Sequence, residues 1–106
     1  NYTSARDAAT VLQRLAAGTI ATPELCERAR GYLLAQEDMR GIVEGVPSDV
    51  SVAHKTGSLA NAQHDAAIVY AEHPYVLVVL TQDLGREQAL ALERDISSAI
   101  YARAHS

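Results

Sequence analysis

The only lysine of the chain lies in a short stretch whose residue types could bind an anion. Lys55 is followed by Thr56, Gly57 and Ser58, whereas all the other basic residues are arginines. An ammonium beside a hydroxyl can bind a carboxylate through charge-assisted hydrogen bonds, and a glycine lets a bulky ligand approach the backbone. The same residues also fit a solvated lysine at a strand edge followed by a turn, so the motif alone leaves both interpretations open.

The histidines, with Asp65 and Cys26, form a second group that could bind a metal or activate a nucleophile. Their spacing matches no compact ligand pattern, so we predict no metal site and no cofactor. A triad of Ser58, His64 and Asp65 is disfavoured because neighbouring strand side chains point to opposite faces. We expect His64 and Asp65 to orient the loop that follows the strand containing Lys55. We expect His54, on the same strand, to be buried. Cys26 lies on an apolar helical face and should fill the core.

Length and charge limit the classes of function. A chain of 106 residues with 48% hydrophobic and 21% charged residues is one small domain of ordinary globular composition. Its formal net charge of −4 argues against nucleic acid as a partner. The longest apolar run, residues 76–80, is too short to cross a membrane, so we predict no transmembrane segment. Because the chain does not start with methionine, we expect it to begin within a longer protein or after processing.

Two helices are predicted within residues 1–36. Ser4 begins a capping pattern ahead of apolar positions at helical spacing, and Gly18 should end this first helix. Thr22 followed by Pro23 is typical of the start of a second helix, which should fade at the end of this segment.

The rest of the chain is predicted to change from an irregular connection to a sheet. Residues 37–51 contain two glycines and a proline among apolar residues, which indicates a packed irregular connection. The segments 50–57, 64–71 and 75–82 are short and rich in β-branched residues, which predicts three strands. A short link before the third strand and a looser one at residues 59–63 favour a three-stranded antiparallel meander.

A long terminal helix is predicted over residues 85–104, so that residues 52–106 comprise the sheet and this helix. The apolar stripe expected to pack on the sheet consists of Ala89, Leu92, Ile96, Ala99 and Ile100. The strand YVLVVL is apolar on both faces, so the two N-terminal helices should cover the other side. We therefore predict an α+β fold in a single partial domain, residues 1–106, because the open edges of so small a sheet indicate a missing part.

The segment HKTGSLANAQHDAAIVY, followed by YVLVVLT, resembles the C-terminal part of class A serine β-lactamases and the related penicillin-binding proteins. The segment TSARDAATVLQRL is similar to the helix found upstream in such enzymes. The resemblance covers nearly the whole chain and implies a partial β-lactamase/transpeptidase-like fold. It also implies a serine hydrolase that acts on a β-lactam or a cell-wall peptide in a secreted, periplasmic or cell-envelope location.

The resemblance assigns a role to each residue of the segment from Lys55 to Ser58, here called the lysine stretch. Lys55 and Thr56 would bind the carboxylate of the substrate, and Gly57 would leave room for the substrate beside the strand. The backbone N–H of Ser58 would be one of two donors that stabilise the oxyanion formed on the lactam carbonyl. One departure is Gln63, which stands where relatives often carry an arginine that helps to bind the carboxylate.

Two other motifs of the resembled enzymes are absent from this sequence. The pattern Ser-x-x-Lys would require serine in place of Val52, and Ser-x-Asn would require serine in place of Leu59. We therefore expect a C-terminal fragment that is inactive alone and supplies the substrate-binding and oxyanion strand. Its partner would be the remainder of its own polypeptide or a second copy. The alternatives are a fragment of a penicillin-binding D,D-transpeptidase or carboxypeptidase, and a non-catalytic binding or assembly module.

Overall fold

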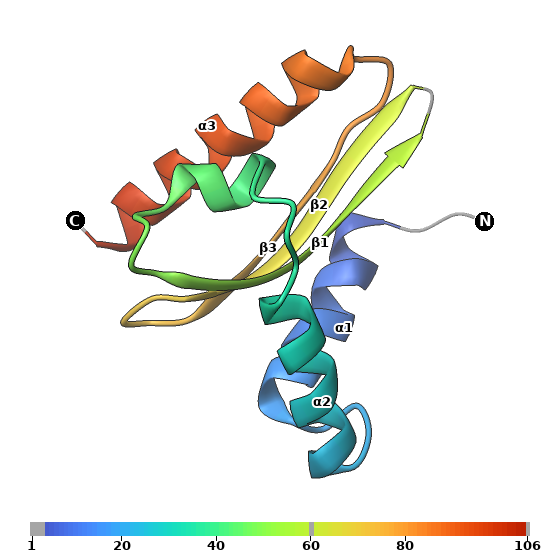
Figure 1. The fold of residues 1–106 in the computed structure, drawn as a ribbon, viewed down its shortest axis with the longest axis vertical. Helices are drawn as coiled ribbons and strands as arrows, with labels where there is room; N and C mark the ends of the chain where they lie inside the picture. Colours follow the sequence, from blue (N-terminus) through green and yellow to red (C-terminus); the bar gives the residue numbers. More distant parts are fainter. Residues whose placement is uncertain (1–3, 60, 106) are drawn as a thin grey trace.

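The computed structural model describes residues 4–59 and 61–105, in which helices precede and follow a sheet (Figure 1). The elements are α1 (Ala5–Ala17), α2 (Pro23–Leu34), the 3-10 helix η1 (Gly41–Gly45), β1 (Ser51–Leu59), β2 (Ala62–Tyr70), β3 (Tyr75–Leu80) and α3 (Arg86–Ala104). This order confirms the predicted α+β class, and η1 lies inside the predicted connection. Among the described residues, no helix is both long and apolar enough to span a membrane.

Side-chain caps explain where α1 and α2 begin. Ser4 Oγ accepts a hydrogen bond from the N–H of Asp7 at 3.1 Å, and Thr22 Oγ1 accepts one from the N–H of Leu25 at 3.2 Å. Each bond satisfies a backbone donor that the first turn of a helix leaves without a partner. Gly18 ends α1 with a φ of 74°, a left-handed conformation that glycine adopts at little cost. The predicted start of each helix is confirmed.

The three strands form one antiparallel sheet in the order β1, β2, β3, which confirms the predicted meander. β1 and β2 pair from Ser51 opposite Tyr70 to Leu59 opposite Ala62. The pairing therefore extends into residues 59–63, and the looser link predicted there is wrong. The polar residues of this segment gave no strand signal, but cross-strand backbone hydrogen bonds can extend a hairpin whatever the side chains are.

The sheet lies between two helical layers (Figure 1). α1 and α2 cover one face, and η1 together with α3 covers the other. The main core cluster, on the η1 side, consists of Ile42, Val46, Val52, Ala67, Val69 and Val79. On the other side Ala53, Ile68 and the predicted core residue Cys26 are each at most 1% exposed. Both faces of the sheet are therefore covered, as the two-sided apolar sequence of β3 required.

The face that α3 turns inward differs from the predicted stripe. The buried residues of the helix are Ala89, Leu90, Glu93 and Ser97. By contrast, Leu92 is 42% exposed, Ile100 is 41% exposed and Ala99 is also exposed, so the stripe is wrong for these three residues. η1 packs closely on this face of α3, where a Cβ on Gly45 would stand 2.6 Å from Ser97 Cβ, so a small residue is buried at that contact. Ser97 Oγ also donates a hydrogen bond to the carbonyl oxygen of Ile42 at 2.7 Å.

Candidate functional site

The lysine stretch lies near the end of β1, an outer strand of the described sheet. Side chains alternate along a strand, so neighbours face opposite layers. Thr56 is paired with Asp65 and shares the face of the sheet that η1 and α3 cover, whereas Lys55 is paired with Ala66 and lies on the other face. The ammonium and the hydroxyl therefore leave the strand on different sides.

The lysine stretch presents an ammonium and open space beside its backbone. Lys55 is exposed, and its Nζ donates a hydrogen bond to the carbonyl oxygen of Thr56 at 2.8 Å, which uses one of three donors. A Cβ added at Gly57 would meet no atom within 4 Å. Ser58 Oγ donates to Gln63 Oε1 at 2.6 Å. The Gln63 side chain, only 2% exposed, is thus directed to a neighbouring residue rather than to solvent.

The hydroxyl of Thr56 has a partner that sequence reasoning missed. Thr56 Oγ1 donates a hydrogen bond to Asp38 Oδ2 at 3.2 Å. Asp38 precedes η1, in the connection from α2, and is far from Thr56 in the sequence. No spacing pattern links the two residues, so only the path of the connection over β1 brings them together.

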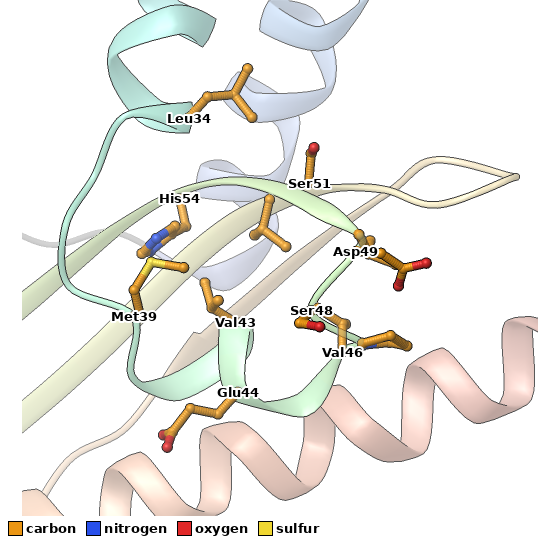
Figure 2. A pocket seen from close by; sticks show the side chains of 12 residues that line it. Leu34, Met39, Val43, Glu44, Val46, Ser48, Asp49, Ser51 and His54 are labelled. Atoms are coloured by element: carbon orange, nitrogen blue, oxygen red, sulfur yellow. The ribbon is translucent and has the colours of Figure 1, made fainter.

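A hollow of about 670 Å³ lies beside the first part of β1 (Figure 2). Leu34 at the end of α2, together with Met39 and Val43, contributes apolar surface, and the His54 side chain reaches the same space. Residues 55–58 are not among those that line it. The structure therefore separates this hollow from the lysine stretch.

A buried pair of acids, which sequence reasoning also missed, lies between the sheet and α3. Asp65 in β2 and Glu93 in α3 are both 0% exposed. Asp65 Oδ2 accepts a hydrogen bond from the N–H of Ile42 at 2.9 Å, whereas the carboxyl oxygens of Glu93 have no such partner among the described residues. A Cβ on Gly41 would stand 2.6 Å from Asp65 Oδ2 and 3.1 Å from Glu93 Oε1. The two carboxyl groups therefore converge on one small space.

Burial determines the protonation of this acidic pair. It raises the pKa of Asp65 to about 7 and the pKa of Glu93 to about 8, because loss of water disfavours the charged form. The charge of Asp65 raises the pKa of Glu93 further. His54 Nδ1 lies 3.9 Å from Asp65 Oδ1, beyond hydrogen-bonding distance, and burial lowers the pKa of His54. At neutral pH, Glu93 therefore keeps its proton and the imidazole of His54 is uncharged.

His64 and Asp65 stabilise elements other than the predicted loop. His64 Nδ1 accepts a hydrogen bond from the N–H of Thr81, just after β3, at 3.1 Å, while Asp65 binds the N–H of Ile42 in η1. The predicted role of these two residues in orienting the loop after β1 is therefore wrong. Alternation along β2 places them on opposite faces, so they do not form a triad with Ser58. Within the described residues, no three His, Cys, Asp or Glu side chains are grouped as metal ligands.

A profile described as the beta-lactamase enzyme family matches residues 1–104 of the chain. A search among curated proteins finds no match.

Several solved structures share the fold of nearly the whole chain. The structure of PBP-A is similar with a TM-score of 0.87 and 22% identity, over 97% of this chain and 40% of that chain. A β-lactamase from Sphaerobacter thermophilus has a TM-score of 0.86 and 27% identity, over 94% and 40% of the two chains. A β-lactamase from Burkholderia vietnamiensis has a TM-score of 0.88 and 20% identity, over 98% and 41%. The chain thus spans about two fifths of the length of the structures that it matches.

Proposed function

The chain belongs to the β-lactamase enzyme family, as the resemblance of its sequence indicated, and from this premise we propose that it is the C-terminal part of a serine hydrolase acting on β-lactams. One observation supports the site: the lysine stretch lies on an outer strand, with an exposed ammonium and open space beside Gly57. The chain covers about 40% of the matched structures, so the nucleophile would come from further polypeptide. In this proposal residues 1–106 form one partial domain that the further polypeptide completes.

The proposed site would bind the substrate at two points. Lys55 and Thr56 leave β1 on opposite sides, but Lys55 Nζ folds back to the carbonyl oxygen of Thr56, so in this proposal both hold the carboxylate beside the backbone of this outer strand. The backbone N–H of Ser58 donates to the lactam carbonyl oxygen as that oxygen becomes negative. A serine hydroxyl from outside this chain attacks the carbonyl carbon, the C–N bond of the lactam breaks, and the hydroxyl proton passes to the nitrogen. Water then attacks the resulting ester, which releases the serine and leaves a carboxylic acid. The chain alone is expected to form no adduct.

A peptidase that acts on cell-wall peptides is the second candidate, and Gln63 favours it. Hydrolysis of a β-lactam benefits from strong binding of its carboxylate, but Gln63 is buried and bonded to Ser58, so it adds no cation to the site. A mutant of PBP-A, which has the same fold, has been solved as an acyl-enzyme complex with penicillin G. For either candidate we propose a secreted, periplasmic or cell-envelope location, because both substrates occur outside the cytoplasmic membrane.

Acylation of the protein that carries this chain and its remaining polypeptide tests the proposal. The protein is mixed with benzylpenicillin, and its intact mass is followed over time. The Lys55→Gln variant is expected to acylate about 10- to 100-fold more slowly, because a charge-assisted hydrogen bond to the carboxylate is lost. The Arg28→Gln variant removes a positive charge from an exposed position on α2 and should acylate like the unmodified protein.

The time course separates the candidates. An adduct that forms and disappears supports the hydrolase, and an adduct that persists supports the peptidase. If no adduct forms, both acyl-transfer proposals fail and a non-catalytic binding or assembly module is left. If Lys55→Gln and Arg28→Gln acylate equally fast, the role proposed for Lys55 is wrong even though the enzyme class holds.

A further inference from the structure

A carboxylate adjoins the proposed substrate-binding strand at Thr56. Asp38 Oδ2 accepts a hydrogen bond from the hydroxyl of Thr56 at 3.2 Å, and Asp38 Oδ1 accepts one from the backbone N–H of Arg40 at 3.2 Å. Each carboxylate oxygen therefore has a donor, and together the two bonds hold the group beside the hydroxyl. While the first bond is made, Thr56 cannot donate the same proton to a ligand.

Asp38 forms no ion pair with any of the described residues. The guanidinium of Arg40 is instead directed to Glu87, with two N···O distances of 2.9 Å. The ammonium of Lys55 binds a backbone carbonyl. The charge of Asp38 also acts on the neighbouring interior, because it adds to the effect of burial in raising the pKa of Asp65. Asp38 still interacts with the charge of Arg40 at longer range, but with no ion pair its charge is only partly offset, so a ligand at Thr56 would meet a negative charge.

This charge affects anionic and zwitterionic ligands differently. A ligand whose carboxylate approaches the Thr56 hydroxyl is repelled by Asp38. Charges a few ångströms apart at a partly shielded surface can change a binding constant by about tenfold or more. A ligand with a cation next to its carboxylate can instead place that cation against Asp38 while the carboxylate meets Lys55.

We propose, on the basis of the proposed function, that Asp38 is a specificity-determining residue of this site. It favours acyl donors that carry a positive charge beside the carboxylate over donors that are purely anionic there. The residue takes no part in bond making or breaking, so its effect belongs to binding.

Two cephalosporins that share a side chain and ring system provide the test. Next to its carboxylate, cephaloridine carries a cationic pyridinium, where cephalothin carries an uncharged acetoxy group. KM and kcat are measured for both with the protein that contains this chain and its remaining polypeptide. We expect KM to be about tenfold lower for cephaloridine. In Asp38→Asn, KM for cephalothin should fall until the two values are within about twofold, with kcat little changed. Salt at about 1 M should reduce the preference of the unmodified protein.

Asp95→Asn is the matched control, because it removes the same charge from an exposed position on α3. It should leave the KM ratio unchanged. If Asp38→Asn keeps the ratio of the unmodified protein while adducts still form, the inference is wrong and the proposed function stands. A loss of kcat or of thermal stability with no change in the ratio would show a purely structural role and would also overturn the inference. If neither cephalosporin acylates the unmodified protein, the proposed function fails and the inference fails with it.

Discussion

Replacing Gly45 with alanine is expected to lower the free energy of unfolding by about 1–3 kcal/mol or more. The new Cβ would stand 2.5 Å from the carbonyl oxygen of Arg94 and 2.6 Å from Ser97 Cβ. A backbone oxygen inside a helix cannot rotate away, so η1 would have to move off α3. That movement would also weaken the hydrogen bond from Ser97 to Ile42. Urea denaturation followed by circular dichroism measures the change.

Gly31→Ala is the matched control, because it adds the same methyl group to an exposed position inside α2. A Cβ at Gly31 would meet no atom within 4 Å. Alanine is the better helix former, so this variant should be more stable than the unmodified protein by about 0.5–1 kcal/mol. Equal stability of Gly45→Ala and Gly31→Ala would contradict the close contact between η1 and α3.

Raising the pH from about 6.5 to 8 should destabilise the protein through its buried acidic pair. Burial raises the pKa of Asp65 to about 7 and that of Glu93 to about 8, while the unfolded chain ionises both near pH 4. Above pH 4 the unfolded state therefore binds fewer protons, and folding stability decreases with pH until the folded groups also ionise. Each group contributes up to about 1.4 kcal/mol per pH unit while its folded form keeps the proton, and the contribution of Asp65 declines above pH 7. His54 opposes this loss only at the lower end of the range: its folded pKa is lowered, so unfolding takes up a proton near pH 6.5, and this effect fades above pH 7 as the unfolded imidazole also becomes neutral.

The Glu93→Gln variant tests this assignment, because glutamine has nearly the same shape and never ionises. Its free energy of unfolding should depend less on pH between about 6.5 and 8, and it should exceed that of the unmodified protein above pH 8. Glu27→Gln changes an exposed position on α2 and should keep the original pH dependence. If the Glu93→Gln and Glu27→Gln profiles coincide, the pKa of Glu93 is not raised by burial.

Local signals in the sequence were sufficient to predict much of the fold. Ser4, Thr22 and Gly18 act through neighbouring residues, so the helix boundaries that they set could be read without tertiary information. The apolar strand at residues 75–80 similarly required cover on both faces, and the structure supplies it. The spacing of strands and short links led to the correct meander for the same reason.

Features that depend on long-range packing were missed. The rotation of α3 follows from its contact with η1, and a residue such as Ser97 is buried there for its size and its hydrogen bond rather than for hydrophobicity. Glu93 is buried although its charge left it out of the predicted apolar stripe. Asp38 reaches Thr56 only because the connection from α2 crosses β1, a path that no local pattern predicts. Such contacts between distant segments require coordinates.

The buried thiol of Cys26, a residue of α2, can report partial opening of the fold. It is the sole cysteine of the chain and only 1% exposed, so an alkylating reagent reaches it only when α2 separates from the elements packed against it, β1 and α1, or when the whole protein unfolds. Labelling kinetics under native conditions therefore measure the free energy of that separation. A value well below the global free energy of unfolding would identify the N-terminal helices as an independently opening unit, and an equal value would show that they unfold together with the sheet.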